Sequence, residues 1–263
     1  MTATATLSMH CGSKAATESR VRSIQAPDGT DTWVPIPHFE LLDHVQEVMS
    51  EKGLVVDQTS KKFGLKRDDN QMFAVLKVIS DQDKDFGLSV GLRNSTDKSL
   101  SAAMCFGSNV FVCDNLVFSG EQTLARKHTK NIRDGLRDMI SDALDQADVF
   151  RAFNERLYAS MKQADVTDGV VHDMVCRAFR ADAIPVSRIK HVLDEWYKPS
   201  HPEFEPRNAW SMFNAFTESA KVGFARNPHT ASQRTMRLTR LMQRTFAPTL
   251  VGKSEVPLWL TIN

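Results

Sequence analysis

The sequence lacks the long apolar runs and one-sided charge that would assign it to several large classes of protein. No stretch of the 263 residues approaches the roughly eighteen consecutive apolar residues of a transmembrane helix. The first twenty residues also lack the apolar core of a signal peptide. We therefore expect a cytoplasmic protein with no membrane association. Because the formal net charge is only +1, any binding to a polyanion must come from local segregation of charge.

Cysteine is scarce, and the four cysteines form no CxxC pair. This spacing predicts free thiols in a reducing compartment rather than a disulfide framework. The nearest approach to a metal-binding set combines Cys105 and Cys113 with Asp114 and His128. Without CxxC or HxxxH spacing, such cysteines are more often core residues, so no metal site is predicted.

Motifs of the common catalytic classes are also absent. The chain contains no GxGxxG dinucleotide loop, P-loop, HExxH, GxSxG or kinase signature. Adjacent polar residues such as His172 and Asp173 fall on an expected helix, where solvent-facing side chains are the usual case. We therefore predict no cofactor and assign no catalytic residue. A metal-dependent nuclease or other hydrolase that uses Asp114 remains the third alternative.

The order of patterns along the chain predicts three regions. Residues 1–30 are rich in Ala, Thr, Ser and Gly without periodic apolar positions, which is typical of a flexible arm. Residues 31–160 form an α+β core that begins with an amphipathic helix from His38, closed by Gly53. Residues 161–263 are mainly helical and either form a separate region or pack on the same core.

The middle of the chain predicts a central antiparallel sheet of four to five strands flanked by helices. Residues 72–79 and 87–92 form two apolar runs separated by a polar segment, which suits a hairpin. Shorter runs follow, up to Gly120. Residues 121–158 then contain no proline and carry apolar side chains at helical spacing, which predicts one long helix or two joined helices. Strands followed by helices give the segregated order of an α+β fold.

Positive charge is concentrated in two stretches that are both expected to be helical. In residues 125–137 the basic residues outnumber the single acid, Asp134. Most of them recur at steps of four, three and four, which places them on one face of a helix. The nucleic-acid-binding residues predicted from this stretch are Arg126, Lys127, Lys130 and Arg133.

The second stretch, residues 220–254, contains no Asp or Glu. On a helix its arginines cover one arc beside an apolar arc, and the planar guanidinium suits phosphate oxygens. The binding residues predicted here are Arg234, Arg237, Arg240 and Arg244. The alternative is that these arginines pair with acids elsewhere in the fold, since the chain has 33 basic and 32 acidic residues.

Polar residues also follow the expected strands, where binding sites often lie. Turn formation explains them equally well, since Asn and Asp readily cap turns. The candidate ligand contacts are Arg93, Asn94, Asp114, Asn115 and His128.

The block GLRNSTDKSLSAAMCFGSNVFVCDNLVFSGE at residues 91–121, followed by ARKHTKNI at 125–132, resembles the phage/plasmid-like protein family catalogued as domain of unknown function number 932. WVPIPHFELLDHV near the N-terminus and, more loosely, AWSMFNAFTESAK near residue 209 extend the resemblance. It implies an accessory protein of a mobile element, with no settled activity to transfer. The order of antiparallel sheet and basic helix is also similar to single-strand annealing proteins, whose subunits form rings with nucleic acid in a basic groove.

These observations together favour a non-enzymatic protein that binds nucleic acid, more specifically single-stranded DNA, in DNA metabolism or recombination. Sequence specificity should be low, because backbone phosphates carry no base identity. A homo-oligomer is a further expectation. The main alternative is a protein-interaction module in which the same arginines bind an acidic surface of a host or defence protein.

Overall fold

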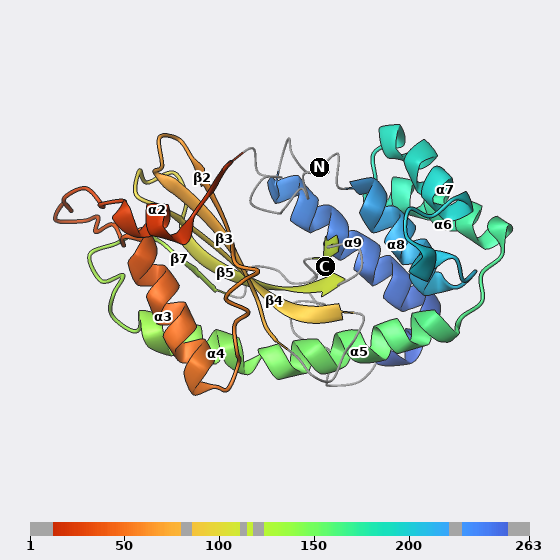
Figure 1. The fold of residues 1–263 in the computed structure, drawn as a ribbon, viewed down its shortest axis with the longest axis horizontal. Coiled ribbons are helices and arrows are strands. Elements are labelled where there is room, and N and C mark those ends of the chain that lie inside the picture. Colours follow the sequence, from red (N-terminus) through yellow and green to blue (C-terminus); the bar gives the residue numbers. More distant parts are fainter. Residues whose placement is uncertain (1–12, 80–85, 111–114, 118–123, 221–227, 252–263) are drawn as a thin grey trace.

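The computed structural model describes residues 13–79, 86–110, 115–117, 124–220 and 228–251. It shows an antiparallel sheet at one end of the long axis and a mainly helical region at the other (Figure 1). The predicted α+β fold class, with a central antiparallel sheet and a mainly helical C-terminal half, is therefore confirmed.

The sheet has seven strands in the described chain, more than the four to five predicted. They are β1 Lys14–Ala16, β2 Lys62–Lys66, β3 Gln71–Lys77, β4 Phe86–Ser95, β5 Ala102–Val110, β6 Asn115–Val117 and β7 Leu124–Arg126. Strands β1 to β6 lie in chain order, and β7 pairs with β5 as well. The predicted hairpin is β3–β4. Strand β5 continues through Gly107 without a break.

Helices flank the sheet and build the C-terminal half. They are α2 Glu18–Ser23, α3 His38–Glu51, α4 Leu136–Asp145, α5 Ala147–Gln163, α6 Asp168–Arg180, α7 Ile189–Tyr197, α8 Ala209–Ala220 and α9 Pro228–Phe246, with short 3-10 turns at Val186–Arg188, Pro202–Phe204 and Pro248–Val251. The first of these turns, η1, leads into α7. Local signals explain several ends: Thr167 caps α6 by accepting a hydrogen bond from the Val170 N–H. Gly53 follows α3 with a positive φ of 74°.

Residues 13–23 are not part of a flexible arm, which corrects the prediction for this segment. Strand β1 pairs with β2, and Val21 of α2 is buried in the core beside the sheet. The Thr17 side chain caps α2, and Arg22 pairs with Asp43 of α3 at 2.7 Å. A three-residue strand and a six-residue helix with one buried apolar residue are too short to produce a periodic pattern.

Residues 124–135, for which the sequence predicts a helix, form a short strand and turns instead. Strand β7 ends at Arg126 and turns follow up to Gly135, whose φ of +66° is in the left-handed region. Helix α4 begins only at Leu136, and it meets α5 at Gln146, as expected for two joined helices. The basic residues of the first stretch therefore do not lie on one helical face. These residues are Arg126, Lys127, Lys130 and Arg133.

Buried apolar side chains form two separate groups. The first core lies between the sheet and the helices α2, α3 and α4, and it includes Phe106 and Phe150. The second core lies among α5 to α9 and includes Phe153 and Phe213. Helix α5 contributes to both, so the change of core along the chain falls inside this helix (Figure 1). The predicted boundary near residue 160 remains a prediction.

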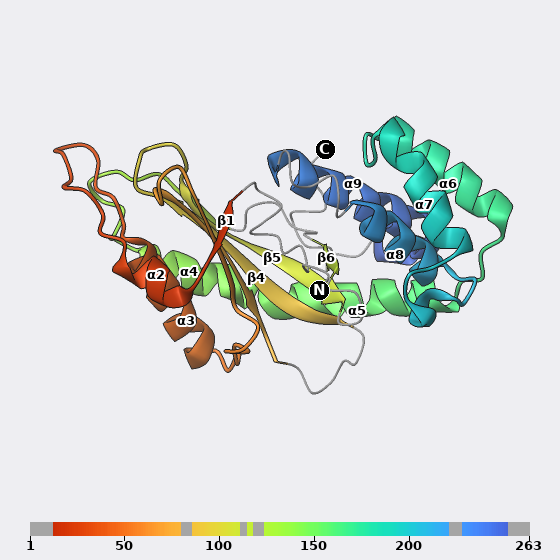
Figure 2. The same ribbon diagram turned by 45° about the horizontal axis from the view of Figure 1, so that its top comes forward.

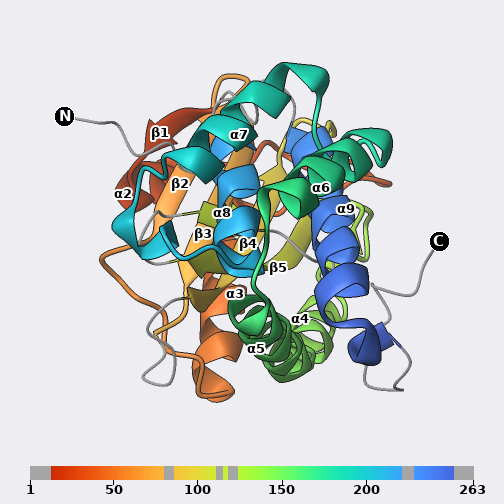
Figure 3. The ribbon, with the colours of Figure 1, turned by 90° about the vertical axis from the view of Figure 1, so that its right-hand side faces the viewer.

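One face of the sheet packs on the first core, and the second face turns toward α8 and α9 (Figure 2). Seen from the helical end, α6 to α9 stand in front of the sheet, with α4 and α5 below (Figure 3). Successive side chains of a strand point to opposite faces. In β4 the side chains of Leu88, Val90 and Leu92 belong to the first core. The second face of β4 therefore carries Ser89, Gly91 and Arg93.

Candidate functional site

Two of the four basic residues predicted in the first stretch have structural partners. Arg126 donates hydrogen bonds to the main-chain oxygens of Asn131 and Asp134, at 3.0 and 3.1 Å, and so holds the turns after β7. Arg133 forms a two-pronged ion pair with Glu40 of α3, at 2.7 and 2.9 Å. Hydrogen bonding to Glu40 raises the pKa of Arg133 above its usual value. Both guanidinium groups therefore stabilise the fold itself.

Lys127 and Lys130 differ from these arginines. Both side chains are exposed, and within the described ranges neither has an ion pair. They remain available to an external anion.

The arginines of α9 are also divided. Arg237 pairs with the Asp182 carboxylate and donates to the Asp182 main-chain oxygen at 3.2 Å, and Arg234 lies 3.9 Å from the same carboxylate. Arg240 is half-buried, whereas Arg244 is exposed near the end of the helix. The alternative that arginines of this stretch pair with acids elsewhere in the fold is therefore confirmed for Arg237.

The two basic stretches do not form one strip. Strand β7 and the start of α4 lie beside α3, at the opposite end of the molecule from the C-terminal end of α9 (Figure 1). A single strand of nucleic acid therefore cannot follow both stretches as one short groove.

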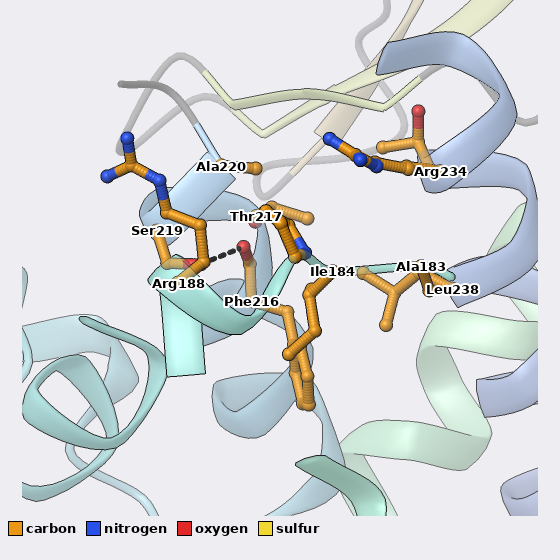
Figure 4. Close-up of a pocket in the computed structure, with 11 residues that line it drawn as sticks. Ala183, Ile184, Arg188, Phe216, Thr217, Ser219, Ala220, Arg234 and Leu238 are labelled. Atoms are coloured by element: carbon orange, nitrogen blue, oxygen red, sulfur yellow. Dashed lines mark hydrogen bonds between the residues drawn. The ribbon is translucent and has the colours of Figure 1, made fainter. Parts of the chain in front are cut away.

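A pocket brings Arg234 into a concave site (Figure 4). It lies between α8, α9 and the segment after α6, and its cavity volume is only about 30 Å³. Ile184, Phe216 and Leu238 supply apolar walls, and Arg188 lies on the opposite side of the pocket from Arg234 (Figure 4). The Nε atom of Arg234 is buried and has no hydrogen-bond acceptor among the described residues. The pocket therefore places one arginine, already close to the Asp182 carboxylate, beside an apolar hollow.

Arg93 has the most unusual surroundings of the predicted contacts. The guanidinium is half-buried on the second face of the sheet, where one terminal nitrogen donates to Ser101 Oγ at 3.3 Å. The Arg93 Nε atom is buried without an acceptor, and no carboxylate of the described chain pairs with this side chain. Burial lowers the pKa of Arg93 and raises that of the nearby Cys105 thiol to about 12. A thiol with this pKa is neutral at pH 7 and provides no counter-charge.

The strand register places Arg93 in a row of small side chains. Directly opposite residues of an antiparallel sheet share a face, and the pairing connects β1, β2, β3, β4, β5 and β7. We call this set the Arg93 row: Ala15, Gly64, Phe73, Arg93, Ala103 and Ala125. With strands spaced about 4.8 Å apart, the row extends for roughly 24 Å. Only Phe73 and Arg93 have large side chains in it.

Two further polar groups share this face. Lys62 lies in the neighbouring row, opposite Val75, and is half-buried without an ion pair in the described part of the chain. Ser89 is fully buried, and its hydroxyl has no hydrogen-bond partner in the described ranges. The face around Arg93 thus carries unsatisfied donors and uncompensated positive charge.

On the opposite face of β4, Asn94 belongs to a buried network that ties the segment before α3 to the sheet. Its amide nitrogen donates to the Ile36 main-chain oxygen at 2.8 Å and to His38 Nδ1 at 3.1 Å. His38 Nε2 contacts the Asp69 main-chain oxygen at 2.9 Å, which assigns the proton to Nε2. The Ile36 N–H donates to His128 Nδ1 at 3.3 Å. Asn94 and His128 therefore have structural partners, and a ligand contact for either remains a prediction.

The two buried histidines predict a loss of stability in mild acid. Burial lowers the pKa of His38 and of His128 below the ordinary value of 6.5. The unfolded chain then binds more protons than the folded one, so the stabilisation is complete above about pH 6.5 and is lost as the pH falls below it. We expect the free energy of unfolding, measured with urea, to fall by roughly 1–2 kcal/mol between pH 7.5 and pH 5.5. As a control, replacement of the exposed His191 with Gln should leave this decline in stability unchanged. Equal free energies of unfolding at the two pH values would contradict the role given to His38 and His128.

The two remaining candidate ligand contacts from the sequence are Asp114 and Asn115. Asp114 lies outside the described residues, and Asn115 begins β6, where it pairs with Val110. Among the residues that the structure describes, no group of three or more His, Cys, Asp or Glu side chains is placed to hold a metal ion. No helix in these ranges is long and apolar enough to span a membrane.

Residues 29–242 match a family model described as a domain of unknown function. The chain belongs to the DUF932 family. The DUF932 match includes Phe73, Arg93 and the His38–Asn94–His128 network, while Arg244 lies beyond it. No curated protein and no solved structure matches the chain.

Proposed function

We propose that this DUF932 protein binds single-stranded nucleic acid, with low sequence specificity, across the second face of its sheet. The observation that carries the proposal is Arg93, a half-buried guanidinium with no carboxylate partner among the residues that the structure describes. Withdrawing a charge from water without a counter-charge costs free energy. Charged groups that are left in this unfavourable state are concentrated at functional sites. A ligand that supplies negative charge removes this cost.

Phosphate fits the site because the planar guanidinium donates two parallel hydrogen bonds to phosphate oxygens. Lys62 adds a positive charge near one end of the Arg93 row. Lys127, two residues beyond Ala125, adds another at the opposite end. Cations spaced along a row of this length suit a chain of phosphates better than a single small anion.

The biological setting belongs to the same proposal. The resemblance to phage and plasmid proteins supports a role in DNA metabolism or recombination of a mobile element, inside the host cytoplasm. Assembly of several copies, as in single-strand annealing proteins, would extend the bound length of strand beyond one subunit.

Binding of fluorescein-labelled oligothymidylate, followed by anisotropy across a salt series, tests the proposal. Each phosphate contact should contribute a slope of about 0.7 in log affinity against log salt concentration. Arg93→Gln should weaken binding roughly 10-fold or more, because a hydrogen bond to a charged group contributes about 1.5–3 kcal/mol. The same variant should be at least as stable as the wild type, since it removes an uncompensated buried charge.

Arg177→Gln is the matched control. Arg177 is an exposed arginine of α6 that pairs with Asp173 at 2.7 Å, so this variant loses the same charge away from the sheet. It should bind as the wild type does. A flat salt response, or equal losses in the two variants, would overturn the proposal.

A protein-interaction module is the second candidate, and exposed apolar side chains of the helical region favour it. Four of them are 38–68% exposed: Val170, Phe179, Val186 and Tyr197. The expected partner is a host or defence protein. A stoichiometric partner that survives nuclease treatment during co-purification, and is lost on Phe179→Ser, would support this candidate over nucleic-acid binding.

A further inference from the structure

Resting on the proposed function, we infer that Phe73 and Arg93 form a single nucleotide-binding site in which the phenyl ring stacks on an unpaired base and the guanidinium holds a neighbouring phosphate. The inference follows from the position of Phe73 in β3, the glycine opposite it on β2 and its pairing with Arg93 on β4. It makes the substrate an unpaired strand rather than a duplex.

Phe73 is placed outside both cores. Its neighbours Met72 and Ala74 are buried in the first core, so alternation along β3 directs Phe73 to the second face. The ring is only half-buried, and it belongs to neither group of buried apolar residues. Full burial of a large aromatic side chain in a central strand normally stabilises the fold. The half-buried ring of Phe73 contributes only part of this free energy.

A glycine lies directly opposite Phe73 on one of the two neighbouring strands. On β2 the directly opposite residue is Gly64, which has no side chain. On β4 the opposite residue is Arg93, and Gly91 lies two residues before it on the same face. One side of the ring is therefore free of a directly opposite side chain, and the other side is bounded by the guanidinium.

The separation of the two groups matches one nucleotide and its phosphate. Directly opposite residues have Cβ atoms about 4.5–5.5 Å apart, so a base on the Phe73 ring brings its backbone within reach of Arg93. Stacking of a base on an aromatic side chain contributes about 1–3 kcal/mol and tolerates every base. In a duplex the bases are already stacked on one another, so they cannot reach the ring without unpairing.

Three probes of equal length separate the contributions of base and backbone: oligothymidylate, an abasic deoxyribose-phosphate oligomer, and duplex DNA. Phe73→Leu retains an apolar side chain of similar size but cannot stack. It should weaken the binding of oligothymidylate roughly 5- to 100-fold and leave the abasic oligomer unaffected. Phe73→Trp should restore binding of oligothymidylate. Arg93→Gln should weaken the binding of both single-stranded probes, and duplex should bind more weakly than oligothymidylate.

The outcomes distinguish this inference from the proposed function. If Phe73→Leu binds oligothymidylate as tightly as the wild type, or if the abasic oligomer binds equally well, the stacking site is wrong while salt-dependent binding stands. If no probe binds with a salt dependence, the proposed function itself fails. Thermal unfolding of Phe73→Leu within a few degrees of the wild type shows that a loss of binding does not arise from unfolding.

Discussion

Replacing Asn94 with alanine is expected to lower the free energy of unfolding by about 3 kcal/mol. The Asn94 side chain is fully buried, and its amide nitrogen serves two acceptors, the Ile36 main-chain oxygen and His38 Nδ1. Truncation leaves both acceptors buried without a donor, and each such group costs about 1–3 kcal/mol. The variant also leaves a small cavity at the end of β4. Urea unfolding at pH 7.5 measures the difference.

Asn94→Asp keeps the shape of the side chain and is expected to be still more destabilising. It replaces the donating nitrogen with an oxygen that faces the Ile36 main-chain oxygen, and it places a carboxyl group where no water reaches. Asn131→Ala is the control, because this asparagine is exposed and its replacement should change stability by less than about 0.5 kcal/mol. An Asn94→Ala variant within the range of this control would show that the network contributes little.

The longer elements of the fold were predictable from the sequence because burial imposes a period on them. Helix α3 shows its buried face in Leu41, Leu42, Val45 and Val48, and the β3–β4 hairpin shows two apolar runs around a polar segment. The short strands β1, β6 and β7 have no such period. Lys14 pairs with Leu65 across fifty residues of chain, so the hydrogen bonds that define β1 depend on a distant partner.

The helix predicted over residues 125–137 was wrong because its strongest signal came from charged side chains. Basic residues at steps of three and four fit a helix, but exposed charges gain little free energy from that conformation. In the structure the buried residues between β7 and Gly135 are His128 and Ile132, which are too few to define a helical face. Arg126 instead holds the turns of this segment by donating to the Asn131 and Asp134 main-chain oxygens. Buried apolar periodicity begins only with α4.

The candidate site was predictable in part. Arg93 was a candidate because it follows an expected strand, yet it lies inside β4, which extends to Ser95. Phe73 was missed, although Met72 and Ala74 on the core side of β3 place it on the opposite face. Alternation assigns a side chain to a face, but it does not report whether a second layer covers that face. That no described carboxylate pairs with Arg93 also depends on residues far apart in the chain.

Replacing Phe213 with alanine is expected to destabilise the helical region by about 3–5 kcal/mol and to leave the sheet largely protected. Phe213 of α8 is fully buried in the second core, with its ring centroid 6.1 Å from that of Tyr158 and 6.0 Å from that of Trp210. Hydrogen exchange followed by mass spectrometry should show faster exchange in α6 to α9 than in β3 to β5.

Phe106→Ala is the matched variant in the first core, where Phe106 packs on Phe150 at 5.8 Å between ring centroids. It should accelerate exchange in β3 to β5 instead. The reason is that the two cores have no described residue in common, and α5 supplies Phe150 to the core beside the sheet and Phe153 to the core among the helices. Helix α5 and the short strand β6, which contacts α8 and α9, transmit only part of the stability of one core to the other, so each core opens separately. Equal acceleration throughout the chain in both variants would instead show one cooperative unit, with α5 as a rigid link between the two cores.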